Sequence, residues 1–191
     1  MSTTNPTQFA LLLRILHWLM AGLLLAMLFI GVTMVASLGD YHTLITIHRP
    51  LGILILVLAA IRLGTRMLTR LPAFPPTMAP VERHVATASE LLLYTLFFAT
   101  PLVGWGMLSA GHYPIVLFGA VHLPPILPAS PGLYALLRET HTVLAYLLFL
   151  TLIAHLGAVL FHTLVLRDRL LNRMVPWAVP AADDGSRTSR T

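Results

Sequence analysis

The sequence contains no cysteine and no lysine, and only 10% of its residues are charged. The absence of cysteine excludes disulfides, thiolate-bound iron–sulfur clusters, zinc ribbons and the cysteine-linked attachment of c-type haem. Soluble domains contain about 25% charged residues, so the low charge argues against a soluble globular protein and against a disordered chain. Apolar residues, by contrast, make up 57% of the 191 positions. This composition favours an integral membrane protein.

Four apolar stretches are long enough to cross a bilayer, which requires about 20 apolar residues in a helix. They cover residues 9–35, 43–67, 85–108 and 132–166. The first run is too long for a signal peptide and no small-residue cleavage motif follows it, so we expect it to remain as a span. A fifth stretch, 113–129, contains four prolines, and lipid offers no partner for the backbone groups that proline leaves unpaired. We expect that stretch to form a loop or a short interfacial helix.

The sequence therefore predicts an all-α, integral membrane four-helix bundle, and the arginines predict its orientation. Ten of the twelve flank one side of the spans: Arg14, Arg62, Arg66, Arg70, Arg83, Arg167, Arg169, Arg173, Arg187 and Arg190. Only Arg49 and Arg138 lie on the other side. Because arginine accumulates on the cytoplasmic side of membranes, both termini are predicted to be cytoplasmic. The arginines are scattered between apolar runs, which argues against nucleic acid binding.

One transmembrane domain, residues 1–177, is expected to account for most of the chain. Residues 71–80 contain four prolines and are predicted to form an extended cytoplasmic loop. Residues 178–191 are largely small and polar, and we expect them to form a disordered cytoplasmic tail.

Four histidines lie within the predicted spans, where ionisable side chains are costly and usually functional. His141 and His155 are fourteen residues apart, so they share one helix face and lie about 21 Å apart along the axis. That distance is too long for one metal ion but suits two planar cofactors, one in each leaflet. The span directions place His48 at the depth of His141 in the outer leaflet, and His17 at the depth of His155 in the inner leaflet. Two haem b groups, each with a pair of histidines as axial iron ligands, fit this pattern.

Other uses of these histidines remain open at this point. A single membrane histidine can be a packed, hydrogen-bonded residue, and several can form a metal-ion path or a proton relay. The scarcity of carboxylates argues against a path or relay, because Glu90 and Glu139 lie near span ends and Asp40 lies in a loop. Small residues four positions after three of the histidines would leave room for a haem ring, although they also serve helix packing. They are Ala21, Gly52 and Ala145.

Several stretches together resemble the bacterial cytochrome b561 family of small four-helix dihaem membrane cytochromes. They are RILHW (14–18), IHRPLGILILVLAAIRLGTR (47–66), LLYTLFFATPLVGWGML (92–108), HTVLAYLLFLTLIAHLGAVLFH (141–162) and DRLLNRMVP (168–176). Their order and spacing are specific and cover residues 8–177. The resemblance puts the family's haem ligands on His17, His48, His141 and His155. It also implies electron exchange with ubiquinone in the bacterial inner membrane, and at least one family member is a superoxide oxidase.

Two outer arginines and one inner histidine are further candidates for the cofactor sites. Arg49 follows His48, and Arg138 precedes His141 by one helical turn. Both arginines can bind haem propionates or attract an anionic donor; the alternative is that they are ordinary flanking residues with their heads in the interface. His162 can donate a hydrogen bond to a quinone carbonyl beside the inner haem, or it is a plain interfacial histidine.

Arg62 and Arg66 lie one turn apart at the inner end of the second span. The simpler interpretation makes them cytoplasmic anchors, and the alternative makes them ligands of an inner haem propionate.

Three classes of function are compatible with these residues. The leading one is a dihaem b-type cytochrome that carries single electrons between an outer-side donor, superoxide among the candidates, and the ubiquinone pool. Such a protein is at minimum an electron-transfer protein, and with superoxide as donor it is an oxidoreductase. The second is a cytochrome b anchor subunit that links a dehydrogenase or hydrogenase to quinone. The third is a histidine-lined metal transporter without haem.

Overall fold

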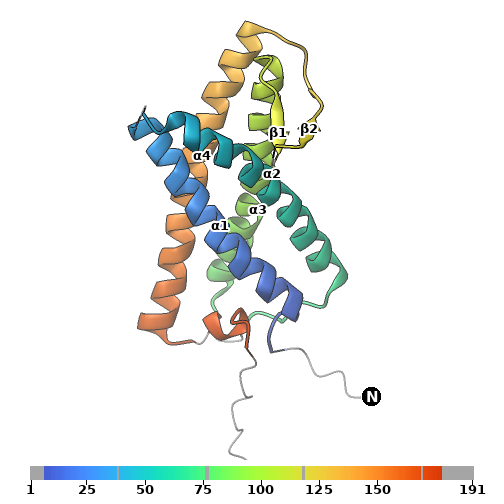
Figure 1. Cartoon of the computed structure of the whole chain (residues 1–191). Coiled ribbons are helices and arrows are strands. Elements are labelled where there is room, and N and C mark those ends of the chain that lie inside the picture. The colour runs from blue at the N-terminus through green and yellow to red at the C-terminus, as the bar shows by residue number, and fades with distance from the viewer. Residues whose placement is uncertain (1–6, 38, 76–77, 118, 169, 178–191) are drawn as a thin grey trace, which may run out of the picture.

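The computed structural model describes residues 7–37, 39–75, 78–117, 119–168 and 170–177, and four long helices dominate it (Figure 1). The helices are α1 (Leu11–Ala36), α2 (Tyr41–Leu68), α3 (Pro80–Ala110) and α4 (Pro131–Leu160), and α4 continues as a π-helical turn, η1 (Phe161–Leu166). Each is long and apolar enough to cross a membrane. The predicted helical fold with four spans is therefore confirmed. The predicted tail, 178–191, lies outside the described residues.

The first residues of α3 differ from the prediction, which placed the start of the third span at residue 85 and Pro80 in a loop. The helix begins at Pro80 itself. Proline is well suited to the first turn because its missing N–H would be unpaired there anyway. Glu82 also stabilises this start, since its carboxylate accepts a 2.8 Å hydrogen bond from the backbone N–H of Ala79.

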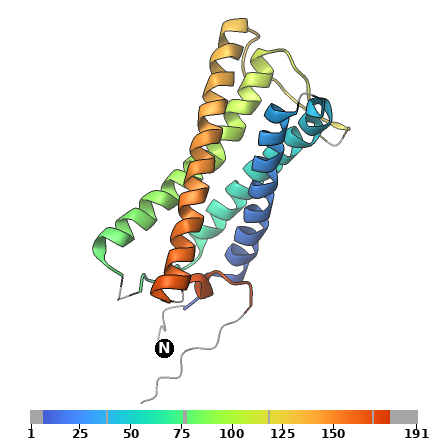
Figure 2. The same cartoon turned by 90° about the vertical axis from the view of Figure 1, so that its left-hand side faces the viewer.

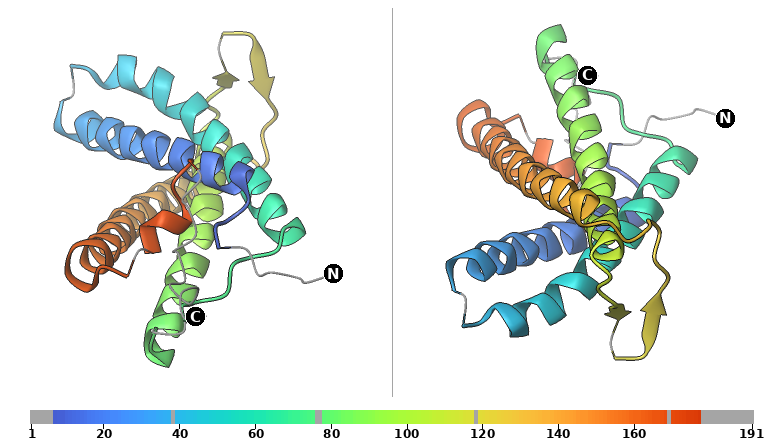
Figure 3. Two further views of the ribbon diagram at one scale, coloured as in Figure 1. Left: turned by 90° about the horizontal axis from the view of Figure 1, so that it is seen from below. Right: turned by 90° about the horizontal axis from the view of Figure 1, so that it is seen from above.

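The four helices associate as two pairs. α1 packs along α2, α3 packs along α4, and α2 joins the pairs through α3 (Figures 2 and 3). The buried core takes residues from every helix: Met20, Leu24, Ile55, Ala59, Leu93, Tyr94, Leu96, Phe97 and Leu148. Most other large apolar side chains are exposed. This is expected for helices in lipid, because lipid tails are as apolar as leucine and do not drive every apolar face inward.

The segment after α4 returns to the start of α1, at one end of the bundle (Figure 1). It contains the short 3-10 helix η2 (Leu170–Arg173). The Phe9 N–H donates a 3.1 Å bond to the carbonyl of Arg173. Trp18 Nε1 and Arg14 Nη1 donate to the carbonyls of Met174 and Val175 at 2.9 Å each. These bonds close that end of the bundle, and Arg14 serves as a structural clamp there.

The connection between α3 and α4 contains a β-hairpin, formed by β1 (Ile115–Leu117) and β2 (Val121–Leu123). The antiparallel register pairs Ile115 with Leu123, Val116 with His122 and Leu117 with Val121. The short helix that we considered for 113–129 is therefore wrong, and the loop alternative is correct only around the strands. The reason is the position of the prolines: all four lie outside the strands, so neither strand loses a hydrogen-bond donor.

The side chains of α3 hold this hairpin loop in place. Trp105 Nε1 donates a 3.0 Å hydrogen bond to the carbonyl of Pro124. The Ile126 N–H donates a 3.1 Å bond to Ser109 Oγ, which in turn donates to the carbonyl of Trp105. The hairpin is thereby attached to the end of the bundle opposite to η2 (Figure 1).

Candidate cofactor site

The four histidines of the predicted spans lie in two facing pairs. The ring centres of His48 on α2 and His141 on α4 are 6.3 Å apart. Those of His17 on α1 and His155 on α4 are 6.4 Å apart. The depth argument predicted this spatial pairing, and the structure brings the same residues together. α4 thus supplies one ring to each pair.

The spacing within each pair fits one metal ion between two imidazoles. Metal–nitrogen bonds of about 2 Å place the centres of two opposed imidazole ligands about 6 Å apart. Each pair offers only two ligands, and no group of three or more metal-ligating side chains occurs among the described residues. Haem brings four nitrogen ligands of its own and needs two more from the protein. The pairs therefore fit haem better than a bare ion in transit.

α3 contributes no ring to the outer pair, but it positions His141. The Nδ1 of His141 lies 3.1 Å from the carbonyl oxygen of Thr100. When Nδ1 carries the proton it donates to this carbonyl, which leaves Nε2 free as a ligand. A Cβ atom on Gly104 would lie 3.1 Å from Cε1 of His141, which is a tight contact, so glycine at this position lets the ring approach α3 without having to shift.

Thr100 and Gly104 are site residues that sequence reasoning missed. They are four positions apart and so share one face of α3. A glycine one turn after a threonine, near the outer end of an apolar span, was the available signal. It did not reveal which helix the pair would meet.

Arg49 lies beside the outer pair and reaches the hairpin loop. Its Nη1 donates a 3.4 Å bond to the carbonyl of Pro114. Its Nε and the Nδ1 of His48 are both buried without a hydrogen-bond partner among the described residues. Buried polar atoms normally have partners, so this environment fits a further polar group such as a haem propionate. Arg138 is exposed one turn before His141.

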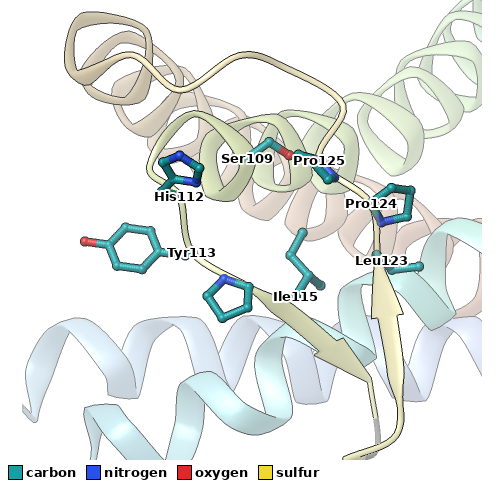
Figure 4. Close-up of a pocket in the computed structure, with 8 residues that line it drawn as sticks. Ser109, His112, Tyr113, Ile115, Leu123, Pro124 and Pro125 are labelled. Carbon is teal, nitrogen blue, oxygen red and sulfur yellow. The ribbon is translucent and has the colours of Figure 1, made fainter.

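A cavity of about 280 Å³ lies beneath the hairpin, lined by Ser109, His112 and Tyr113 among others (Figure 4). None of the paired histidines lines it. Pockets for drug-sized ligands measure about 300–1,000 Å³, so this one is small. The paired rings between the helices, and not this cavity, form the candidate cofactor site.

His162 has a close carboxylate partner that the sequence analysis did not identify. Its Nδ1 lies 2.5 Å from Oδ2 of Asp168, and both side chains are largely shielded from solvent. Asp168 Oδ1 also accepts a bond from the Leu170 N–H. The π-helical turn η1 contains His162, and Arg167 ends it in a left-handed conformation with φ of 52°. This reversal brings Asp168 back to the ring, so Nε2 is the nitrogen of His162 that remains for another partner.

The two arginines at the inner end of α2 have different partners. Arg66 forms a 2.8 Å ion pair with Glu90 of α3. Arg62 instead donates a 2.7 Å hydrogen bond from Nη1 to the hydroxyl of Tyr94, and its guanidinium carbon lies 5.2 Å from the centre of that ring. The carboxylate partner of Arg66 is thus a protein side chain, whereas Arg62 faces the interior of the bundle.

Comparisons with known proteins agree with this architecture. The family model described as prokaryotic cytochrome b561 matches residues 8–177. "Cytochrome b561 homolog 2" of Escherichia coli (strain K12) is 30% identical over 179 residues, which cover 92% of this chain and 95% of the relative. "Probable superoxide oxidase CybB" of Yersinia pestis is 31% identical over 130 residues, 68% of this chain and 73% of the relative. "Cytochrome b562" of Cereibacter sphaeroides is 29% identical over 172 residues, 84% and 90% of the two chains.

The family match spans all four helices and both histidine pairs. Membership implies haem b, which is consistent with the spacing of the paired rings. It also implies a bacterial protein that transfers electrons within a membrane. The chain belongs to the prokaryotic cytochrome b561 family.

Proposed function

We propose that this chain is a dihaem b-type cytochrome of the bacterial inner membrane that carries single electrons from an outer-side donor to the ubiquinone pool. The observation that carries the proposal is the pair of ring spacings, 6.3 and 6.4 Å, at two levels of one helix. His48 and His141 would hold the iron of the outer haem. His17 and His155 would hold that of the inner haem.

The protein's own residues hold and tune these sites. Bound haem supplies the one-electron chemistry. α4 keeps the two levels about 21 Å apart along its axis, because His141 and His155 are fourteen residues apart. The Thr100 carbonyl orients His141 and raises the basicity of its ligating nitrogen.

The orientation follows from the arginines. Of the nine arginines in the described residues, seven flank the end of the bundle that holds the start of α1 and η2. That end is cytoplasmic, with both termini of the 1–177 domain there, and the hairpin end faces outward. Reporter fusions test this: a fusion in 71–80 should report the cytoplasm, and one at Gly119 the outer side. The reverse result would refute the orientation.

Ubiquinone binds at the inner haem, where His162 donates a hydrogen bond from Nε2 to a quinone carbonyl when both ring nitrogens carry a proton and Nδ1 donates to the Asp168 carboxylate. Asp168 supports this role because it holds the ring through Nδ1 and so directs Nε2 elsewhere. The electron donor on the outer side is superoxide, and the activity is then that of a superoxide:ubiquinone oxidoreductase. Support comes from Arg49 and Arg138 at the outer site and from the relative that is named a superoxide oxidase.

Haem quantitation on the purified protein tests the proposal. We expect a dithionite-reduced minus oxidised spectrum of b type and two haems per chain. A colourless protein would indicate the metal transporter, and one haem per chain would refute the dihaem assignment. A soluble subunit that co-purifies in stoichiometric amount would make the chain an anchor subunit instead.

A further inference from the structure

Arg62 is a charged residue within the membrane-spanning part of α2, and its head is turned into the bundle. It bonds to the hydroxyl of Tyr94 and lies over that ring. Tyr94 is only 7% exposed and belongs to the buried core. An arginine that served only as a cytoplasmic anchor would extend its head to the membrane surface. The contact with Tyr94 instead holds the head of Arg62 against the bundle.

The position of Arg62 on α2 corresponds to the level of the inner histidine pair. Arg62 follows His48 by fourteen residues, the same interval that separates His141 from His155 on α4. It therefore lies on the helix face of His48, about 21 Å nearer the inner end. Three helices thus direct functional side chains to one inner site.

The charge of Arg62 has no counter-ion among the described residues. The ion pairs there are Arg66 with Glu90 and His162 with Asp168. Tyr94 supplies a neutral hydroxyl, and the Nε of Arg62 is buried without a hydrogen-bond partner in the described part of the chain. Arg62 is half-buried, and a cation that is partly shielded from water without an opposite charge is costly within a membrane. The site is therefore suited to an anionic group that the protein itself does not provide.

We propose that Arg62 is the cationic group of the inner haem site, where it binds a propionate and raises the reduction potential of that haem. Tyr94 acts as the positioning residue that holds the guanidinium there. The inference rests on the dihaem function proposed above. It concerns the transfer of one electron from the ferrous outer haem to the ferric inner haem, in which the outer iron is oxidised and the inner iron reduced. A nearby cation favours this direction because the ferric site carries one more positive charge than the ferrous site.

A redox titration of the two-haem protein tests the proposal, with Arg62→Gln as the variant and Arg66→Gln as its matched control. Both remove one arginine from the same end of α2, but Arg66 already has Glu90 as its partner. We expect Arg62→Gln to lower one of the two midpoint potentials by at least about 59 mV, which is tenfold in a one-electron equilibrium constant. Arg66→Gln should leave both potentials within a third of that shift. Equal effects of the two variants, or no effect of Arg62→Gln, would overturn the proposal.

Tyr94→Phe decides the question if Arg62→Gln loses the inner haem. This variant keeps the charge but frees the guanidinium, so the same midpoint should fall by a smaller amount. An unchanged midpoint in Tyr94→Phe would then overturn the proposal. Failure of the dihaem function itself is distinguishable, because it appears as fewer than two haems in the wild-type protein before any variant is titrated.

Discussion

The outer and inner histidine pairs have nearly the same ring spacing but different surroundings. Backbone groups of α3 shape the outer pair, through the Thr100 carbonyl and the close approach at Gly104. A half-buried cation, Arg62, lies at the level of the inner pair along α2 and bonds to Tyr94, and His162 with Asp168 lies beyond it. If the ligands alone decided their properties, the two sites would be equivalent, because each consists of two histidines at nearly the same spacing. Their neighbours make them unequal, because hydrogen bonds and nearby charge also tune a bound haem.

The largest effect that we expect is the loss of one of the two haems when a single histidine of either pair is replaced. His48→Ala or His141→Ala should lose mainly the outer haem, and His17→Ala or His155→Ala mainly the inner haem, because each pair is proposed to hold one haem. Haem content per chain should fall by about half in each variant, measured by haem quantitation with spectra of the remaining haem. If His17→Ala and His48→Ala removed the same haem, the pairing would be wrong.

Gly104→Ala should weaken the outer site alone. The new Cβ would lie 3.1 Å from Cε1 of His141, so the ring must move from its place beside Thr100. Changes to groups that orient a metal ligand typically cost about 10–100-fold in affinity, and we expect about tenfold weaker outer haem binding. Gly64→Ala is the matched control, because nothing lies within 4 Å of a Cβ at that position of α2. An outer haem that is retained equally in both variants would contradict the role of α3.

Arg138→Gln should slow the reduction of the haems by superoxide about threefold at low salt, because it removes an exposed positive charge beside the outer pair. The difference should shrink as ionic strength rises, since the Debye length falls to about 8 Å at physiological salt. Stopped-flow reduction at two salt concentrations measures it. Arg70→Gln, an exposed arginine after α2, is the control and should have no effect. Salt-independent reduction, or none, would favour a quinol-fed carrier or an anchor subunit over superoxide oxidation.

The smallest effect should come from Asp168→Asn. This variant tests whether His162 belongs to the quinone site at the inner haem. The variant weakens the contact that holds His162. The loss of such a hydrogen bond corresponds to a change of about threefold in the rate at which added quinol reduces the inner haem. Reduction from the outer side should stay at the wild-type rate. Asp40→Asn is the control and should change neither rate. In the wild-type protein, the Asp40 carboxylate accepts a hydrogen bond from Ser37 before α2. A slower reduction from the outer side would place His162 outside the quinone site.

The hairpin and the end of α4 contain details of local structure that the sequence did not reveal. The prolines around 113–129 excluded a membrane span correctly, but they did not reveal that three residues on each side of Gly119 would pair as strands. The fourth span ends at residue 166 as predicted, but its last turn is π-helical and the chain reverses at Arg167. Hairpin pairing and a change of helical hydrogen bonding depend on local contacts that apolar periodicity does not record.

The sequence by itself determined the number of spans and the pairing of the four histidines. Span number depends on the length of apolar runs, and the shared face of His141 and His155 depends on their interval along one helix. Only the tertiary structure decided which backbone carbonyl meets His141, that Arg62 turns toward Tyr94 while Arg66 meets Glu90, and that Asp168 holds His162. The reason is physical: the first properties are periodic along one segment. The second depend on how far each helix is rotated against neighbours that lie far from it in the sequence.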